Sequence, residues 1–236
     1  MFKRFRVSLF GAKVMLSVVV SLFCLWAIQA EAAPIPGLYD TGVSSSNALL
    51  PDGTTDPHYT LTLSSDPLHP GPAALVVNSS SGDPIFTGPW LADGPNSKWI
   101  APQANQSYPT GGDPGGPYTY ETTFNLTGLN PATAVITGEW TTDNEGVNIL
   151  INGASTGFTT PFNAFTAFHP FTISSGFVSG INTLDFEVNN DGNATGLRVE
   201  LSGTASPVQE PVSLLLLGAG LVGMAVIKRK NQEEEV

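Results

Sequence analysis

The sequence predicts an all-β protein built on an antiparallel β-sandwich, with a separate segment at each end. Three observations support this fold class. Apolar residues in the middle of the chain alternate with polar ones at every second position, and no stretch from Pro34 to Ser206 repeats at helical spacing. Glycine, proline and asparagine divide this region into roughly eight or nine short strands. A parallel α/β fold is disfavoured because no segment could supply its crossover helices.

Residues 1–32 are expected to form a secretory signal peptide. Basic residues between positions 3 and 13 precede an apolar run at 14–28, and Ala30-Glu31-Ala32 fits a cleavage site of small residues. The alternative is a permanent membrane helix, but the run is shorter than the roughly 20 residues that a span needs. The one cysteine, Cys24, lies in this segment, so the mature chain contains none.

The charge of the mature region excludes one class of partner. Residues 33–206 carry fifteen carboxylates against two basic residues, Lys98 and Arg198, a formal charge of −13. Such a domain repels nucleic acid and anionic membrane surfaces. We therefore expect no nucleic-acid partner.

The sandwich domain is expected at residues 56–205, after a loop-like segment at 33–55. Strands are expected at residues 58–63, 73–78, 118–126, 133–141, 146–151, 168–173, 182–188 and 197–201. Asn152-Gly153, directly after one of them, indicates a two-residue hairpin turn. Residues 102–117 are expected to form a long loop, which in such folds is either functional or mobile.

The order of features from about residue 56 to residue 205 resembles the galactose-binding-like jelly-roll. A strand with Trp140 leads through an acidic turn at Asp143-Asn144 to the hairpin that ends in Asn152-Gly153. The segment Gly180-Ile181-Asn182-Thr183-Leu184 then begins a strand that ends in asparagine. The resemblance implies a jelly-roll. This fold hosts carbohydrate binding, accessory modules of enzymes and structural domains, so it does not fix a function.

Loops at one end of such a jelly-roll are where its sugar-binding members bind. Asp143, Asn144 and Asn190 could offer hydrogen bonds to sugar hydroxyls there. Trp90 and Trp99 could stack on a sugar ring, or they could fill the core or a structural corner. The sequence leaves both interpretations of the two indoles open.

Acidic turns suggest a second kind of ligand. Asp143, Glu145 and Asp191 lie on expected turns, and calcium takes hard oxygen ligands. The same residue types are ordinary in turns, and no ordered one-three-five ligand pattern accompanies them. The three histidines include no pair at metal-ligand spacing. We predict no metal and no cofactor, with calcium at these three carboxylates as the one candidate.

One short motif suggests hydrolysis. Gly153-Ala154-Ser155-Thr156-Gly157 matches G-x-S-x-G, which presents a nucleophilic serine when it lies on a strand-to-helix turn. Here the motif begins in an expected hairpin turn, and the residues after it show no helical pattern. We therefore predict that the protein is not an enzyme.

The last segment, residues 206–236, predicts a membrane-spanning sorting signal. A Pro-containing hinge leads into an apolar run at 212–227, and the basic cluster Lys228-Arg229-Lys230 stops it. A helix of this length rises about 24 Å, so lysine side chains that reach the interface would help it cross a hydrocarbon core of about 30 Å. The positive-inside rule places the basic cluster in the cytoplasm and the domain outside.

This tail resembles the sorting signal of the PEP-CTERM family of exported bacterial proteins, which has a Pro-Glu-Pro motif, a transmembrane helix and a basic end. Glu210 and Pro211 match the last two motif residues, and Gln209 stands where the first proline is expected. The resemblance implies cleavage by an exosortase, a membrane enzyme, in a Gram-negative bacterium that makes extracellular polysaccharide. Because Gln209 stands in place of the first proline, cleavage of the tail is expected to be less efficient than with the full motif.

The sequence thus predicts an exported, non-enzymatic protein. It would be anchored in the inner membrane in transit and then reside at the cell surface or in the extracellular matrix. The alternative is a carbohydrate-binding module that recognises exopolysaccharide, and a hydrolase is the third and least favoured hypothesis.

Overall fold

The computed structural model describes residues 31–79, 88–107, 111–209, 220–221 and 224. The expected signal peptide lies almost wholly outside the described residues, as do Glu210, Pro211, the basic cluster 228–230 and most of the apolar run. Within the described part, no helix is both long enough and apolar enough to cross a membrane. The chain divides into two units, Met1–Glu31 and Ala32–Val236, and the strands all lie in the second.

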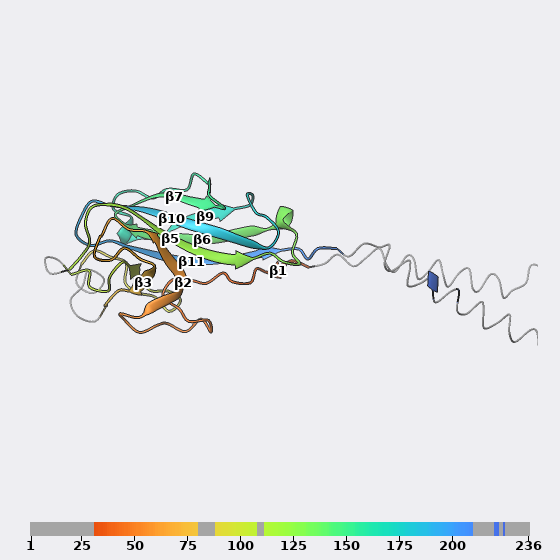
Figure 1. Ribbon diagram of the computed structural model, residues 1–236, viewed down its shortest axis with the longest axis horizontal. Coiled ribbons are helices and arrows are strands. Elements are labelled where there is room, and N and C mark those ends of the chain that lie inside the picture. The colour runs from red at the N-terminus through yellow and green to blue at the C-terminus, as the bar shows by residue number, and fades with distance from the viewer. Residues whose placement is uncertain (1–30, 80–87, 108–110, 210–219, 222–223, 225–236) are drawn as a thin grey trace, which may run out of the picture. The chain divides into compact units, whose positions relative to one another are not determined.

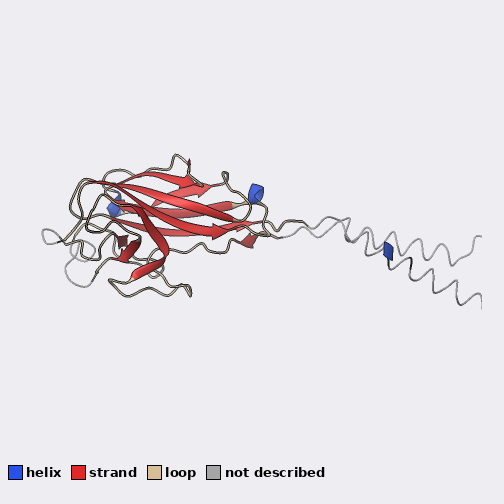
Figure 2. Ribbon diagram, viewed as in Figure 1, coloured by secondary structure: helices blue, strands red, loops and turns tan. Residues whose placement is uncertain are grey.

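The described strands form one continuous antiparallel sheet of eleven strands (Figures 1 and 2). Their bounds are β1 Ala33–Pro34, β2 Thr55–Leu63, β3 Ala73–Val76, β4 Ile100–Ala101, β5 Gly116–Asn125, β6 Val135–Asp143, β7 Glu145–Ile151, β8 Ala154–Ser155, β9 His169–Ile173, β10 Ile181–Asn190 and β11 Gly196–Ala205. Their order in the sheet is β8-β7-β10-β5-β2-β3-β4-β11-β6-β9, and β1 pairs with β11. Two short 3₁₀ helices, η2 Pro131–Thr133 and η3 Ala164–Thr166, also lie in this region.

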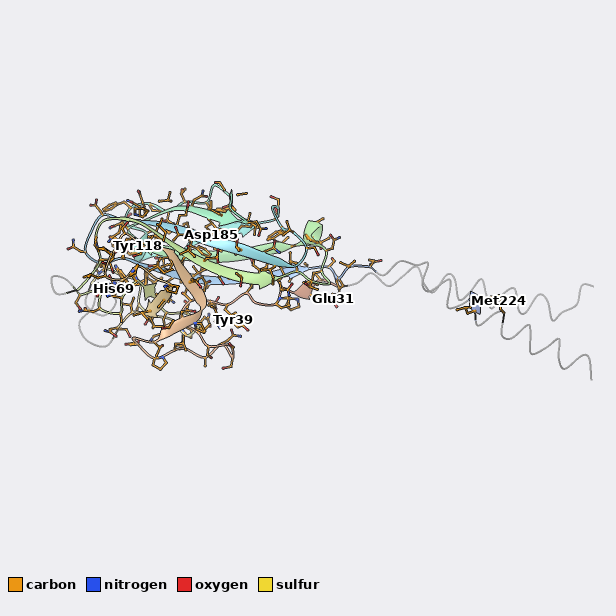
Figure 3. All side chains as sticks on the ribbon, viewed as in Figure 1. Glu31, Tyr39, His69, Tyr118, Asp185 and Met224 are labelled. Atoms are coloured by element: carbon orange, nitrogen blue, oxygen red, sulfur yellow. The ribbon has the colours of Figure 1, made fainter. Side chains whose placement is uncertain are left out.

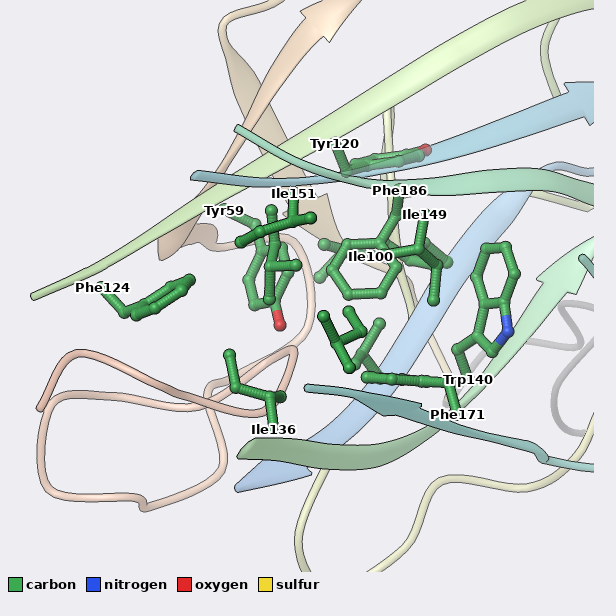
Figure 4. Close-up of a cluster of buried hydrophobic side chains, with 14 of the residues drawn as sticks. Tyr59, Ile100, Tyr120, Phe124, Ile136, Trp140, Ile149, Ile151, Phe171 and Phe186 are labelled. Atoms are coloured by element: carbon green, nitrogen blue, oxygen red, sulfur yellow. The ribbon is translucent and has the colours of Figure 1, made fainter. Parts of the chain in front are cut away.

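The sheet folds over at the short strands β3 and β4, so that its two halves face each other. Trp140 of β6 packs against Phe186 of β10, with ring centroids 5.8 Å apart, and Phe171 of β9 lies 6.1 Å from the same ring. Figure 4 shows these side chains among the buried cluster between the two halves. The arrangement confirms the expected antiparallel β-sandwich.

Each of the eight expected strands overlaps an observed one, and the three additional strands, β1, β4 and β8, have two residues each. A two-residue strand cannot show an alternating pattern, which is why the sequence does not indicate it. The expected hairpin is confirmed: Asn152 and Gly153 have φ values of 50° and 75°, and Ile151 pairs with Ala154 across the turn. Positive φ at both central residues is characteristic of a type I′ turn.

Residues 33–55 contain few strand residues, yet they pack against the sandwich. Ile35 and Val43 are buried, and Ala33 pairs with Ala205 at the last residue of β11. The chain therefore enters and leaves the sandwich at one end, which we call the tail end. At the other end β10 stops at Asn190 and β11 begins at Gly196; we call this the loop end. In Figure 1 the label of β1 lies at the right, whereas His69 in the same view of Figure 3 lies at the left.

Candidate functional site

The loop end gathers the polar residues that the sequence singles out. Asn144 Oδ1 accepts a hydrogen bond of 2.6 Å from the backbone N–H of Asp191. Thr195 Oγ1 donates to the carbonyl oxygen of Asp143 at 2.7 Å. The turn after β6 and the turn after β10 are therefore joined, although some 47 residues separate them in the chain.

Most of these polar groups form hydrogen bonds within the protein. Asn190 is 2% exposed, and its Nδ2 donates to the carbonyl oxygens of Asp113 and Pro114 at 3.0 and 3.1 Å. Its Oδ1 accepts from the backbone N–H of Gly192. A side chain bonded in this way holds two loops together and has little capacity left for a sugar hydroxyl. Of the expected sugar-binding set at these turns, Asn144 alone is partly exposed.

The two tryptophans lie in the interior. Trp90 is 5% exposed and Trp99 0%, and their ring centroids lie 4.2 Å apart in a small cluster with Val77 and Ala101. Trp99 Nε1 donates to the carbonyl oxygen of Leu91 at 2.8 Å. Stacking on a sugar needs an exposed ring face, and neither ring offers one. Both indoles therefore fill a small core, as the second of the two interpretations expected.

Asp143 is also buried, and Trp90 Nε1 donates to its Oδ2 at 2.6 Å. Burial raises the pKa of Asp143 to about 7, and the hydrogen bond from Trp90 opposes the rise. Of the other calcium candidates, Glu145 accepts a hydrogen bond from Asn189 and Asp191 is exposed. In the described part of the chain these three carboxylates do not form a group close enough to share one ion.

A different group at the loop end does meet that condition: Asp66, His69 and Asp113. One ligand atom from each lies within 4.8 Å of the others. His69 Nδ1 is 2.5 Å from Asp66 Oδ2 and 4.0 Å from Asp113 Oδ1. Both carboxylates are buried, while about a third of the His69 side chain is exposed. The group therefore opens to solvent on its histidine side.

Hydrogen bonds fix the two carboxylates from behind. Asp66 Oδ1 accepts from the backbone N–H of Leu68 at 2.8 Å, and Asp113 Oδ2 accepts from Gln106 Nε2 at 2.7 Å. Burial raises the pKa of Asp113 to about 6, and the neighbouring Asp66 adds to the rise. Burial would also raise the pKa of Asp66, but hydrogen bonds from His69 and Leu68 outweigh it and leave that pKa below its usual value.

Sequence reasoning missed this group. Asp66 and His69 lie three residues apart in a turn before the long loop that carries Asp113. The short spacing of Asp66 and His69 and the length of the loop can be read from the sequence. Neither shows that Asp113 folds back against the turn that carries Asp66 and His69.

Ser155, the serine of the G-x-S-x-G match, lies on β8 in the hairpin. Its Oγ donates to Asn148 Oδ1 at 3.1 Å and accepts from Asn148 Nδ2 at 2.8 Å. It lines a groove of about 340 Å³ between the hairpin and the segment after β9, and no histidine is among the lining residues. Residues 156–160 are irregular, so the strand-to-helix turn that activates such a serine is not formed here.

No family model and no curated protein matches the chain. Among solved structures the chain is similar to CBM35 from Paenibacillus barcinonensis, with 17% sequence identity and a TM-score of 0.30. The match covers 61% of this chain and 92% of that one. A likeness this low assigns neither a fold family nor a ligand to the present chain.

Proposed function

We propose that this chain is an exported, non-enzymatic protein of the cell surface or extracellular matrix, sorted through a PEP-CTERM-like signal at residues 206–236. Its cargo is the sandwich domain, a jelly-roll of the galactose-binding-like type. Its partners are an exosortase-like processing enzyme, which acts at Gln209-Glu210-Pro211, and the membrane in which the apolar run is held.

One observation supports this proposal above the others: both connections of the sandwich leave from its tail end. Ala33 pairs with Ala205 and Pro34 with Thr204, so the expected signal-peptide cleavage after Ala32 would fall at the first residue of β1. On the other side of the same end, Gln209 is exposed. Gln209 is thus accessible without unfolding the sandwich, and the loop end lies at the opposite end of the sandwich from Ala33 and Ala205.

The test is the intact mass of the protein in each cell fraction after expression of the full-length chain in a bacterium with an exosortase. The expected product begins at Ala33, has lost the end of its tail and is found outside the cytoplasm. An Ala32→Phe variant, which places a bulky residue at the cleavage site, should keep its N-terminal segment. Full-length protein confined to the cytoplasm would overturn the proposal.

Carbohydrate binding is a second candidate function, and the groove beside the hairpin favours it. Five hydroxyl side chains and one aromatic ring are among the residues that line this groove: Ser155, Thr156, Thr172, Ser174, Ser175 and Phe158. Hydroxyl groups beside an apolar ring suit the mixed polar and apolar faces of a sugar. The site would then lie at this groove, away from the buried tryptophans.

Calorimetric titration of the full-length chain with the exopolysaccharide of its host tests this second function. A double variant, Ser174→Ala with Ser175→Ala, should weaken binding, whereas Ser202→Ala on β11 should leave it unchanged. Both serines of the pair are exposed, so their loss leaves the core intact. Absence of any heat at millimolar sugar would count against the function.

A further inference from the structure

We propose that Asp66, His69 and Asp113 bind one divalent transition-metal ion of the zinc class at the loop end. The inference rests on the geometry of this cluster and does not depend on how the protein is exported. Two carboxylates and an imidazole are a ligand set that zinc takes in proteins, with a fourth position left for water or another ligand.

The separations within the cluster suit a single ion after small side-chain rotations. Metal–ligand bonds of about 2.0–2.2 Å place neighbouring ligands of a tetrahedral site roughly 3.3 Å apart. His69 Nδ1 lies 4.0 Å from Asp113 Oδ1. Its separation of 2.5 Å from Asp66 Oδ2 is that of a hydrogen bond. An ion would displace the proton between these two atoms, which a neutral imidazole can carry on Nε2 instead, and would move the two atoms slightly apart.

A second observation points to a ligand independently of the clustering. Asp113 is 3% exposed, and its Oδ1, the atom nearest His69, receives no hydrogen bond from an N–H or hydroxyl donor in the described part of the chain, so a proton shared with Asp66 is its one partner there. A buried carboxylate oxygen without such a donor is energetically costly, because it has lost its hydrogen bonds to water and no protein N–H or hydroxyl group replaces them. A cation bound between Asp113 and His69 would satisfy this oxygen.

The surroundings hold the carboxylates in the orientation that a metal site needs. Each directs one oxygen into the cluster, because the other oxygen is fixed by Leu68 N–H or by Gln106 Nε2. Gln106 is itself buried, and its Oε1 accepts from the backbone N–H of Thr195 at 2.9 Å, so its amide cannot turn round. Such outer hydrogen bonds orient the ligands of protein metal sites.

Apart from His69 itself, no basic side chain of the described residues pairs with the cluster. The two basic residues between positions 33 and 206 are engaged elsewhere: Lys98 pairs with Asp52, and Arg198 pairs with Glu200. Two adjacent buried carboxylates therefore need either a proton or an exogenous cation. The histidine favours an ion of the zinc class over calcium, which prefers six to eight oxygen ligands.

Protons compete with the ion at this site. The titratable groups that act on Asp113 are Asp66 and His69, and Tyr118 and Tyr120 also lie within its electrostatic reach. A carboxylate or imidazole must give up its proton before it can bind a metal ion. Affinity for the metal should therefore fall between pH 7.5 and pH 5.

The test is calorimetric titration of the chelator-treated full-length chain with zinc chloride at pH 7.5. We expect one ion per chain, and a loss of affinity of about tenfold or more in His69→Ala and in Asp113→Asn. Two matched controls, His169→Ala on β9 and Asp191→Asn at the loop end, should bind as the wild type does. His69 is partly exposed, so its variant keeps the test valid if Asp113→Asn fails to fold.

Cobalt absorption and a calcium titration complete the experiment. Cobalt should show the visible spectrum of a low-symmetry site that includes nitrogen, and this spectrum should be lost in His69→Ala. Zinc affinity that is the same in wild type and His69→Ala would overturn the proposal. Calcium binding without zinc binding would also overturn it, as would the absence of binding to either ion.

Discussion

The indole Nε1 of Trp90 donates a hydrogen bond of 2.6 Å to Oδ2 of Asp143, 53 residues further along the chain. This bond joins the segment around residue 90 to the last residue of β6, in a place where both side chains are buried. A carboxyl group that folds into such a site holds its proton more tightly than it does in the unfolded chain. The stability of the protein should therefore depend on pH in part through Asp143.

We predict that Asp143→Asn removes part of that dependence. The pKa of Asp143 is raised to about 7, so the folded state binds the proton more tightly and the wild type loses stability as pH rises from about 4 to about 7. Relative to the wild type, the variant should gain on the order of 3 kcal/mol between pH 4 and pH 8. Urea denaturation across this range measures the gain. Trp90→Phe removes the opposing hydrogen bond and should make the dependence steeper, whereas parallel curves for wild type and Asp143→Asn would contradict the prediction.

The hairpin turn makes a second prediction. Asn152 Nδ2 donates to the carbonyl oxygen of Gly176 and to Asn182 Oδ1, and Asn152 Oδ1 accepts from the backbone N–H of Thr183. Asn152→Ala loses all three bonds and places alanine at a positive φ, so we expect it to cost roughly 2 kcal/mol of unfolding free energy. Denaturant midpoints should show this loss. Asn148→Ala, whose amide bonds only within the exposed hairpin, is the control and should cost less than half as much.

Arg198 carries the third prediction. Its Nε donates to Ser97 Oγ at 2.7 Å, its Nη1 donates to the carbonyl oxygen of Ala92 at 2.5 Å, and its guanidinium lies 4.8 Å from the centroid of the Phe168 ring. Lysine keeps the charge but cannot reproduce the planar set of donors. Arg198→Lys should therefore lower the unfolding free energy by about 2 kcal/mol.

Thermal and chemical unfolding of Arg198→Lys beside Glu200→Gln would check this assignment. The ion pair between Arg198 Nη2 and Glu200 Oε1 is 3.3 Å long and partly exposed, so its loss should cost less than about 1 kcal/mol. A larger loss in Glu200→Gln than in Arg198→Lys would show that the ion pair, rather than the hydrogen bonds, holds this part of the fold.

The fourth prediction concerns the sorting motif and depends on the proposed function. Gln209→Pro completes the Pro-Glu-Pro motif and should raise the fraction of tail-cleaved protein in a host that contains an exosortase. The ratio of cleaved to uncleaved mass in the cell envelope measures the effect. Ser206→Ala, which changes the hinge without changing the motif, should leave the ratio as it is. An unchanged ratio in Gln209→Pro would show that the exosortase does not recognise the first proline of the motif.

The sequence predicts the longer strands because their side chains alternate between an apolar core and a polar surface. In β10, Leu184, Phe186 and Val188 are buried at every second position, and this pattern is readable without a structure. The same reasoning fails for residues 33–55. Ile35 and Val43 are buried from an irregular backbone, where burial has no period.

The candidate sites are harder to predict, because sequence does not fix where loops meet. The turns at Asp143 and Asn190 are expected at one end, and the structure places them there. Their side chains, however, bond to other loops. Whether Trp90 and Trp99 are exposed depends on the path of the loop between them, which composition does not specify. The approach of Asp113 to His69 is set by buried amides such as Gln106, whose role appears only once the loop is folded.

The pairing of β11 has a mechanical consequence. β11 pairs with β6 from Gly196 to Thr204 without a shift in register. After Ala205 the chain stays bonded to the sandwich as far as Val208, whose backbone N–H donates to the carbonyl oxygen of Gly128. A pull on the tail against anything held at the loop end acts along the axis of β11, at right angles to the hydrogen bonds of that ladder. The bonds are then loaded in shear and share the force, whereas a strand pulled sideways would lose them one after another. An attachment at this point is therefore suited to a protein that must withstand drag.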